Sequence, residues 1–240
     1  MFEAVTSLIT GQYKPTRRIK QLSQASTPAK SLPETFKLSF WDVFKQRGSS
    51  FHEEFSYLRG AADILCLQDV DESRGINLHG TEAYLLPLYE SRAHKDVGLV
   101  NATNRAADIV NPSDYRSVGY SGFLRSIYLQ HDGHGLVVFN VKLTKSNWEQ
   151  ELKFHFHTFD CWKNMAMIVV GDFCLGQNAE RHEVYQHQLK LYGFEQAPLF
   201  GACPSHRALY RGVTLLKTHV DLSTESMFAP ISLVFKTIAK

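Results

Sequence analysis

The sequence contains no apolar run long enough to cross a membrane. Its longest apolar runs, such as 165–170, are far shorter than the ~18 residues that a spanning helix needs. It also has no strong excess of one charge, because 26 basic residues face 24 acidic ones and the formal net charge is +2. Such a balance does not by itself indicate a nucleic-acid or membrane partner. With 44% hydrophobic and 21% charged residues, the composition indicates a soluble globular fold and excludes a disordered or collagen-like chain.

Cysteine is scarce, and no two cysteines have CxxC spacing. The four residues are Cys66, Cys161, Cys174 and Cys203, and three of them lie in apolar sequence surroundings. This pattern predicts reduced, mostly buried thiols in a reducing compartment. The first apolar stretch of the chain is interrupted by Thr6 and Ser7 and has neither a basic start nor a cleavage pattern. Because that is untypical of a signal peptide, we expect a cytoplasmic protein.

A length of 240 residues allows one large domain or two small ones, at about 150 residues per domain. Residues 1–35 are predicted to form a basic N-terminal arm, because from residue 10 onward the basic side chains meet no acid until Glu34. These side chains are Lys14, Arg17, Arg18, Lys20 and Lys30. A solvated or partly ordered tail is favoured over a phosphate-binding arm, and nucleic-acid binding near Arg17 and Arg18 is the alternative. Residues 36–240 are predicted to form the folded domain.

After Pro33, strand patterns alternate with helix patterns. Strands are expected over 36–41, 64–67, 97–100, 124–129, 135–143, 165–170 and 231–235, with a turn at 131–133. Helices are expected from Ser50, where a Ser-x-x-Glu capping box begins, to Gly60, and over 148–164 and 178–192. The chain shows no internal repeat. Strands mixed with a few helices predict a layered α/β sandwich.

Three carboxylates directly follow buried strands: Asp42, Asp69 and Asp172. The ends of adjacent strands meet at one rim of a layered α/β protein, and ligands bind there. Singly, each carboxylate is better explained as a turn or cap residue. Together, the three side chains offer the oxygen ligands that Mg²⁺ prefers.

The residues around these positions resemble the motifs of the endonuclease/exonuclease/phosphatase superfamily, which has the deoxyribonuclease I-like fold. The matching segments, in chain order, are 40–45, 65–70, 139–143, 170–174 and 226–231. The resemblance covers roughly residues 36 to 238, and Tyr210-Arg211-Gly212 resembles a bacterial branch. It implies a four-layer α/β sandwich, with two packed mixed sheets flanked by helices. It also implies phosphoester hydrolysis assisted by Mg²⁺ or Mn²⁺.

Most functional positions of that family are substituted here. Asp42 stands where the family has Asn, and Asp69 stands where it has a metal-binding Glu. Lys142 replaces a family His, and Cys174 replaces a family Asn. Met227 and Phe228 replace the Asp-His pair of the last motif. His206 or Arg207 occupies the position of a further family acid. Methionine and phenylalanine cannot relay a proton, and the loss of one positioned acid or base costs ~10²–10⁴ in rate. We therefore expect a pseudoenzyme that acts as a binding or regulatory module for a protein partner or a phosphate-bearing ligand.

The alternative is a divergent Mg²⁺- or Mn²⁺-dependent phosphodiesterase or nuclease. In that case the resemblance implies that Asp42 and Asp69 hold a weakly bound metal and that Asp172 orients water. Lys142, with Asn140, would contact the phosphate as a flexible point charge.

Four histidines are further candidates for the site. His206 or His219 is a candidate replacement for the missing catalytic histidine. His155 and His157 have the spacing of two ligands of a metal site, but no nearby residue completes such a site. They are better explained as two polar residues on one helix or strand.

Overall fold

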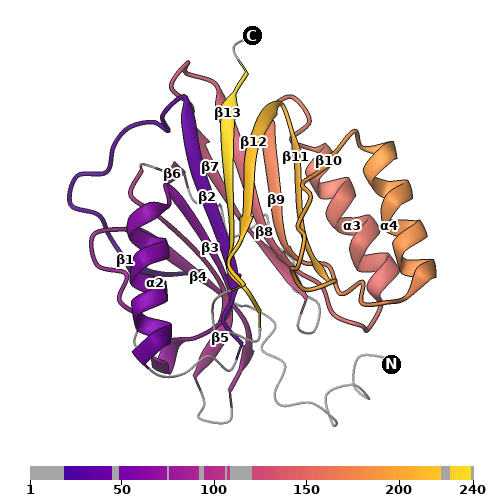
Figure 1. Ribbon diagram of the computed structural model, residues 1–240, viewed down its shortest axis with the longest axis horizontal. Helices are drawn as coiled ribbons and strands as arrows, with labels where there is room; N and C mark the ends of the chain where they lie inside the picture. The colour runs from indigo at the N-terminus through magenta and orange to yellow at the C-terminus, as the bar shows by residue number, and fades with distance from the viewer. Residues whose placement is uncertain are drawn as a thin grey trace.

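Two mixed β-sheets pack face to face, and helices cover their outer faces (Figure 1). The computed structural model describes residues 19–44, 49–74, 76–91, 95–105, 107–108, 121–222 and 228–238. The strands run between the two open ends of this sandwich (Figure 1). Each sheet contains one parallel pair of strands, and the carboxyl ends of both pairs lie at the same open end.

The first sheet has seven strands within the described residues. They are β1 (Lys20–Ser23), β4 (Glu82–Glu90), β5 (Asp96–Thr103), β3 (Ile64–Asp71), β2 (Thr35–Asp42), β13 (Ile231–Thr237) and β12 (Val213–Val220), given in their spatial order. Strands β2 and β3 are parallel, and the other neighbours are antiparallel.

The second sheet has six strands within the described residues. Their spatial order is β10 (Glu195–Gln196), β11 (His206–Arg211), β9 (Ala166–Asp172), β8 (Gly135–Lys142), β7 (Gly122–Leu129) and β6 (Ala107–Asp108). Strands β8 and β9 are parallel, so this sheet also contains one parallel pair among antiparallel neighbours.

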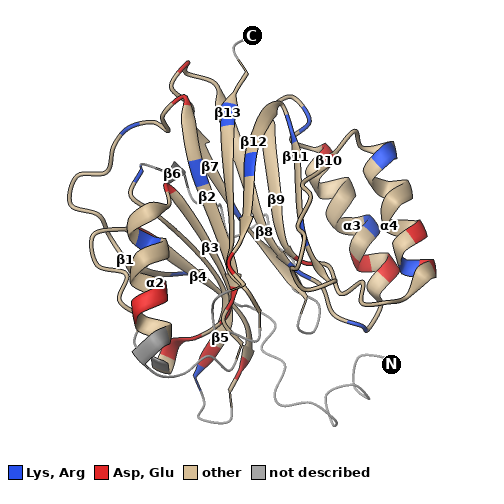
Figure 2. Cartoon of the chain, in the orientation of Figure 1, with Lys and Arg blue, Asp and Glu red and all other residues tan. Residues whose placement is uncertain are grey.

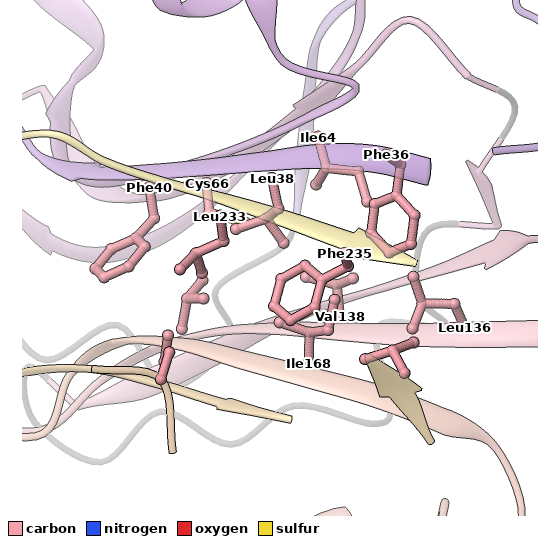
Figure 3. Close-up of a cluster of buried hydrophobic side chains, with 14 of the residues drawn as sticks. Phe36, Leu38, Phe40, Ile64, Cys66, Leu136, Val138, Ile168, Leu233 and Phe235 are labelled. Carbon is pink, nitrogen blue, oxygen red and sulfur yellow. The ribbon is translucent and has the colours of Figure 1, made fainter. Parts of the chain in front are cut away.

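The core between the sheets follows from alternation along the strands. Phe36, Leu38 and Phe40 are two residues apart on β2, so they lie on one face and meet Val138 and Ile168 of the second sheet (Figure 3). Strand β3 is buried along almost its whole length because both of its faces are covered.

Helices complete the outer layers. The predicted apolar face of Phe51, Phe55 and Leu58 on α2 (Ser49–Ala61) packs on the first sheet, and the ring of Phe51 lies 5.3 Å from that of Trp41. Helices α3 (Trp148–Asp160) and α4 (Ala179–Leu191) cover the second sheet, and a short 3-10 helix, η1 (Glu72–Arg74), follows β3. The predicted four-layer α/β sandwich is therefore confirmed.

The differences from the expected elements have local causes. Strand β4 was not predicted because Pro87 breaks the pattern, and the structure accommodates it beside a bulge between Pro87 and Tyr89. Strand β12 was not predicted because it lies at a sheet edge, where only its first residue, Val213, is buried. Helix α3 ends at Asp160 rather than Asn164, since 161–164 form turns.

Part of the predicted N-terminal arm is packed onto the domain. Strand β1 pairs with β4, and Leu32 lies in the core between the sheets. The Lys20 ammonium forms ion pairs with Glu72 at 3.0 Å and Asp96 at 2.6 Å, so carboxylates of the domain neutralise its charge. Arg17 and Arg18 lie outside the described residues, and the domain boundary at residue 35 stays a prediction.

The prediction of mostly buried thiols is wrong. All four cysteines are free, but only Cys66 is buried; Cys161 is exposed and the other two are half-buried. Apolar neighbours in sequence did not imply burial, because Cys161 directly follows the end of α3. A search of the described helices for one long and apolar enough to span a membrane finds none.

Candidate functional site

The predicted site residues meet where β2, β3, β8 and β9 end. Parallel pairing aligns Asp42 with Gln68 in the first sheet and Lys142 with Asp172 in the second. Figure 2 shows acidic positions at this end of the sheets, which is the lower end in the view. As the sequence predicted, the strand ends place these side chains on a common rim.

Lys142 joins the two sheets across this rim. Its Nζ lies 2.5 Å from Asp69 Oδ2 and 3.4 Å from Asp42 Oδ2. The Lys142 side chain is 13% exposed, and those of Asp42 and Asp69 are 2% and 6% exposed. Ion pairs this deeply buried are weakly screened by solvent and salt.

The backbone aims the Asp69 carboxylate at this lysine. Asp69 has φ 53°, the left-handed region that non-glycine residues seldom occupy. It lies in a bulge of β3, where the pairing with β5 shifts between Leu67 and Val70. A bulge commonly redirects one side chain out of the regular alternation, which it does here at Asp69.

Internal donors hold the outer oxygens of the two carboxylates. The backbone N–H of Phe44 donates to Asp42 Oδ1 at 2.9 Å, and the Tyr89 hydroxyl donates to Asp69 Oδ1 at 3.4 Å. Both Oδ2 atoms therefore face Lys142. Burial opposes the lysine charge, but the combined attraction of Asp42, Asp69 and Asp172 outweighs it and raises the pKa of Lys142. Lys142 is protonated throughout the physiological range.

The rim does not fit a divalent cation as it stands. Asp42 and Asp69 were the predicted metal ligands, but their facing oxygens are bound to the Lys142 ammonium. Among the described residues, no three His, Cys, Asp or Glu side chains are grouped so that they could hold a metal ion. A metal at this point would also meet the positive charge of Lys142.

Asp172 stands at the edge of the rim and is half-buried. Its Oδ1 accepts the backbone N–H of Cys174 at 2.7 Å, and Cys174 has φ 51°. Arg181 donates to the Cys174 carbonyl oxygen at 2.7 Å and so holds this turn. Cys174 thus contributes its backbone to the site.

Asn140 lies behind the rim, in the core. Its fully buried amide donates to the carbonyl oxygens of Leu67 and Val100 and to Asn101 Oδ1, at 2.9, 3.1 and 3.1 Å. Gln68 donates to Asn140 Oδ1 at 3.1 Å. This geometry therefore does not support the predicted contact of Asn140 with a phosphate, because its amide is used to link the two sheets. Sequence reasoning missed the role of Gln68, although a polar residue directly after the apolar run 64–67 was a usable signal.

Among the histidines that the structure describes, His206 reaches the rim. Its side chain is 2% exposed, and its Nε2 lies 4.0 Å from Asp42 Oδ2. Its Nδ1 has no hydrogen-bond partner within the described residues. Burial lowers the pKa of His206 despite the nearby charges of Asp172 and Asp42, which keeps the imidazole neutral at physiological pH.

Aromatic rings cover this imidazole. The Phe228 ring lies 5.3 Å from that of His206 and the Phe40 ring 6.0 Å. Trp41 Nε1 donates to the Phe228 carbonyl oxygen at 2.7 Å, which fixes the covering segment. Met227, the other substituted position of this motif, lies outside the described residues.

The remaining histidine candidates lie elsewhere. His219 is exposed on the edge strand β12, opposite Ser232. His155 is buried in α3, with Nδ1 2.5 Å from the Glu151 carbonyl oxygen, whereas His157 is exposed. The His155 and His157 side chains thus point to different surroundings and form no metal site, as the simpler explanation held.

Solved structures share this fold, whereas no protein-family model and no curated protein sequence matches the chain. The human Nocturnin catalytic domain, solved with a bound sulfate anion, has a TM-score of 0.64 at 15% identity, over 92% of this chain and 97% of that domain. An endonuclease/exonuclease/phosphatase family protein from Bacteroides thetaiotaomicron has a TM-score of 0.64 at 9% identity, over 85% of this chain and 98% of that one. The endonuclease domain of TRAS1, a telomere-specific non-LTR retrotransposon, has a TM-score of 0.61 at 8% identity, over 86% and 100%. The chain therefore has the deoxyribonuclease I-like fold that its motifs predicted.

Proposed function

We propose that this endonuclease/exonuclease/phosphatase fold carries a catalytically impaired site and serves as a binding or regulatory module. The observation that supports this is the covered imidazole: His206 is 2% exposed beneath Phe228, which stands where the family has its own histidine. A general acid or base must come within hydrogen-bond reach of the reacting atoms. His206 cannot do so in this arrangement.

Lys142 and its two carboxylate partners do not restore proton transfer at neutral pH. Lys142 stays protonated, and Asp42 and Asp69 are engaged by it. Asp172 is the one strand-end carboxylate of the three that is partly exposed. The loss of one positioned acid or base typically costs ~10²–10⁴ in rate.

The charges at the rim favour a protein partner over a phosphate-bearing ligand. Three carboxylates, Asp42, Asp69 and Asp172, attract the single ammonium of Lys142 at this rim. A phosphate would bring further negative charge to a site whose lysine is already paired with two carboxylates.

The test is a hydrolysis assay on the purified chain with Mg²⁺ or Mn²⁺. Plasmid DNA, RNA and a chromogenic phosphodiester are the substrates, and Asp172→Ala is the matched control. We expect turnover at the level of the buffer alone for both proteins. Turnover well above background that disappears in Asp172→Ala would overturn the proposal.

The second candidate is a divergent metal-dependent phosphodiesterase or nuclease. The His206–Asp42 pair, at 4.0 Å, favours it, because it brings a histidine and an aspartate to the rim from another part of the chain. This candidate predicts that His206→Ala abolishes turnover and that the wild-type protein binds Mg²⁺ or Mn²⁺. A calorimetric titration without measurable heat in the low-millimolar range of metal would count against it.

Nucleic-acid binding through the basic N-terminal arm is a third, separate proposal. It predicts retention on DNA that weakens steeply with salt and is lost in an Arg17→Ala/Arg18→Ala variant. Lys20→Ala is the matched control, because the ion pairs of Lys20 with Glu72 and Asp96 already neutralise its charge. Retention that is absent or insensitive to salt would dispose of this proposal.

A further inference from the structure

We infer that the Lys142 ammonium is the resident cation of this rim: it occupies the point between Asp42 and Asp69 and excludes a divalent metal ion from it. The inference rests on the proposed function and deepens it, because it names the interaction that stands in place of a metal. A divalent ion can occupy this point only where the lysine has been removed.

The geometry places the lysine charge where a metal would have to bind. Its Nζ contacts the Oδ2 atoms of both carboxylates, at 2.5 and 3.4 Å. Mg²⁺ takes its oxygen ligands at about 2.0–2.1 Å, so an ion bridging the same two oxygens would lie against the ammonium. Two positive charges at contact distance in a poorly solvated site repel each other strongly.

The lysine cannot leave without a large penalty. Its backbone lies in β8, paired on one side with Gly122 of β7 and on the other with Asp172 of β9. If its side chain swung outward, two nearly fully buried carboxylates would remain unpaired, and a buried unpaired charge is far costlier than an exposed one. The wild-type site therefore holds its lysine in preference to exchanging it.

The same carboxylates are pre-oriented to receive a different cation once the lysine is removed. Phe44 and Tyr89 hold the two Oδ1 atoms, so the Oδ2 atoms keep pointing to the shared point. Asp172 adds its negative charge from β9, since it also attracts the Lys142 ammonium. Loss of the lysine leaves like charges together, and a divalent ion with its waters relieves that repulsion.

The experiment compares wild type with Lys142→Ala, each freed of metal with a chelator and then titrated with Mn²⁺. Binding is followed by the electron paramagnetic resonance signal of free Mn²⁺ and by the thermal unfolding midpoint, Tm. We expect no change for wild type, and for Lys142→Ala a loss of free-ion signal with a rise in Tm of about 5–10 °C at an ion concentration ~100 times Kd. Lys142→Ala/Asp69→Asn should lose this response, and Lys153→Ala, which removes an exposed pair with Glu149, should match wild type.

A second variant guards against misfolding. Lys142→Gln keeps an amide donor for Asp69 and should also gain Mn²⁺ binding. Rescue of an unfolded Lys142→Ala by Mn²⁺ supports the inference, whereas Mn²⁺ binding by wild type, or no binding by either variant, overturns it. Hydrolysis by wild type tests the proposed function instead, so the two failures are distinguishable.

Discussion

Replacing Lys142 with methionine should destabilise the fold more than any surface substitution. The methionine keeps most of the lysine's volume, so the change isolates the loss of charge. It leaves Asp42 and Asp69, 2% and 6% exposed, without their shared partner. Two buried carboxylates then repel each other and remain poorly solvated.

The magnitude follows from the distances. At an effective dielectric constant of 20, unit charges at the two observed separations attract by about 7 and about 5 kcal/mol before desolvation is subtracted. Desolvation of the ions offsets much of this, and breaking a buried pair typically costs ~3–5 kcal/mol. For a chain of this length that corresponds to a fall in Tm of about 6–20 °C.

The assay is urea and thermal unfolding of both proteins in the presence of a metal chelator, so that no adventitious ion replaces the lysine. Lys153→Met is the matched control; its pair with Glu149, at 2.6 Å, is exposed and should contribute less than about 0.5 kcal/mol. Adding Asp69→Asn to Lys142→Met should recover part of the loss. If Lys142→Met unfolds within about 1 kcal/mol of wild type, the lysine is not the buried counter-ion of these carboxylates.

Three further predictions concern the stability of the domain. Burial lowers the pKa of His155 to about 4, so protonation of this imidazole is disfavoured in the folded state. Below the unfolded pKa of 6.5 the unfolded state therefore binds more protons, and the free energy of unfolding should fall by about 2 kcal/mol between pH 7 and pH 5. His155→Phe should remove this acid sensitivity. Burial and the charge of Asp221 raise the pKa of Glu54 to about 7. Stability is therefore lost as pH rises from the ordinary pKa of this carboxyl, 4.5, through 7; Glu54→Gln should raise Tm at pH 8, whereas Glu53→Gln should leave it unchanged. Asn140→Leu should cost about 1–3 kcal/mol for each stranded acceptor in urea unfolding, and a loss below 1 kcal/mol would refute its role between the sheets.

Much of the fold was readable from local patterns. Phe36, Leu38 and Phe40 alternate, which places them on one strand face, and Phe51, Phe55 and Leu58 repeat with helical spacing; both patterns are buried as expected. Strand β4 was not predicted because Pro87 is unfavourable inside a regular strand. The structure accommodates it beside a bulge, which no local pattern indicates. The pairing partners of edge strands β1 and β12 depend on residues far away in sequence, which no local pattern reports.

The sequence alone determined which carboxylates stand at the strand ends, because buried strands are recognisable and the residues after them follow at once: Asp42, Asp69 and Asp172 were identified in this way, whereas Lys142 was identified through the resemblance of its motif to the family. Tertiary structure decided what these groups do to one another. The left-handed backbone of Asp69 and the packing of the two sheets decide which carboxylate oxygen faces Lys142. The packing also decides that Phe228 covers His206. Distances of a few ångströms and the exclusion of water set these interactions, and both arise only when segments distant in the chain come together.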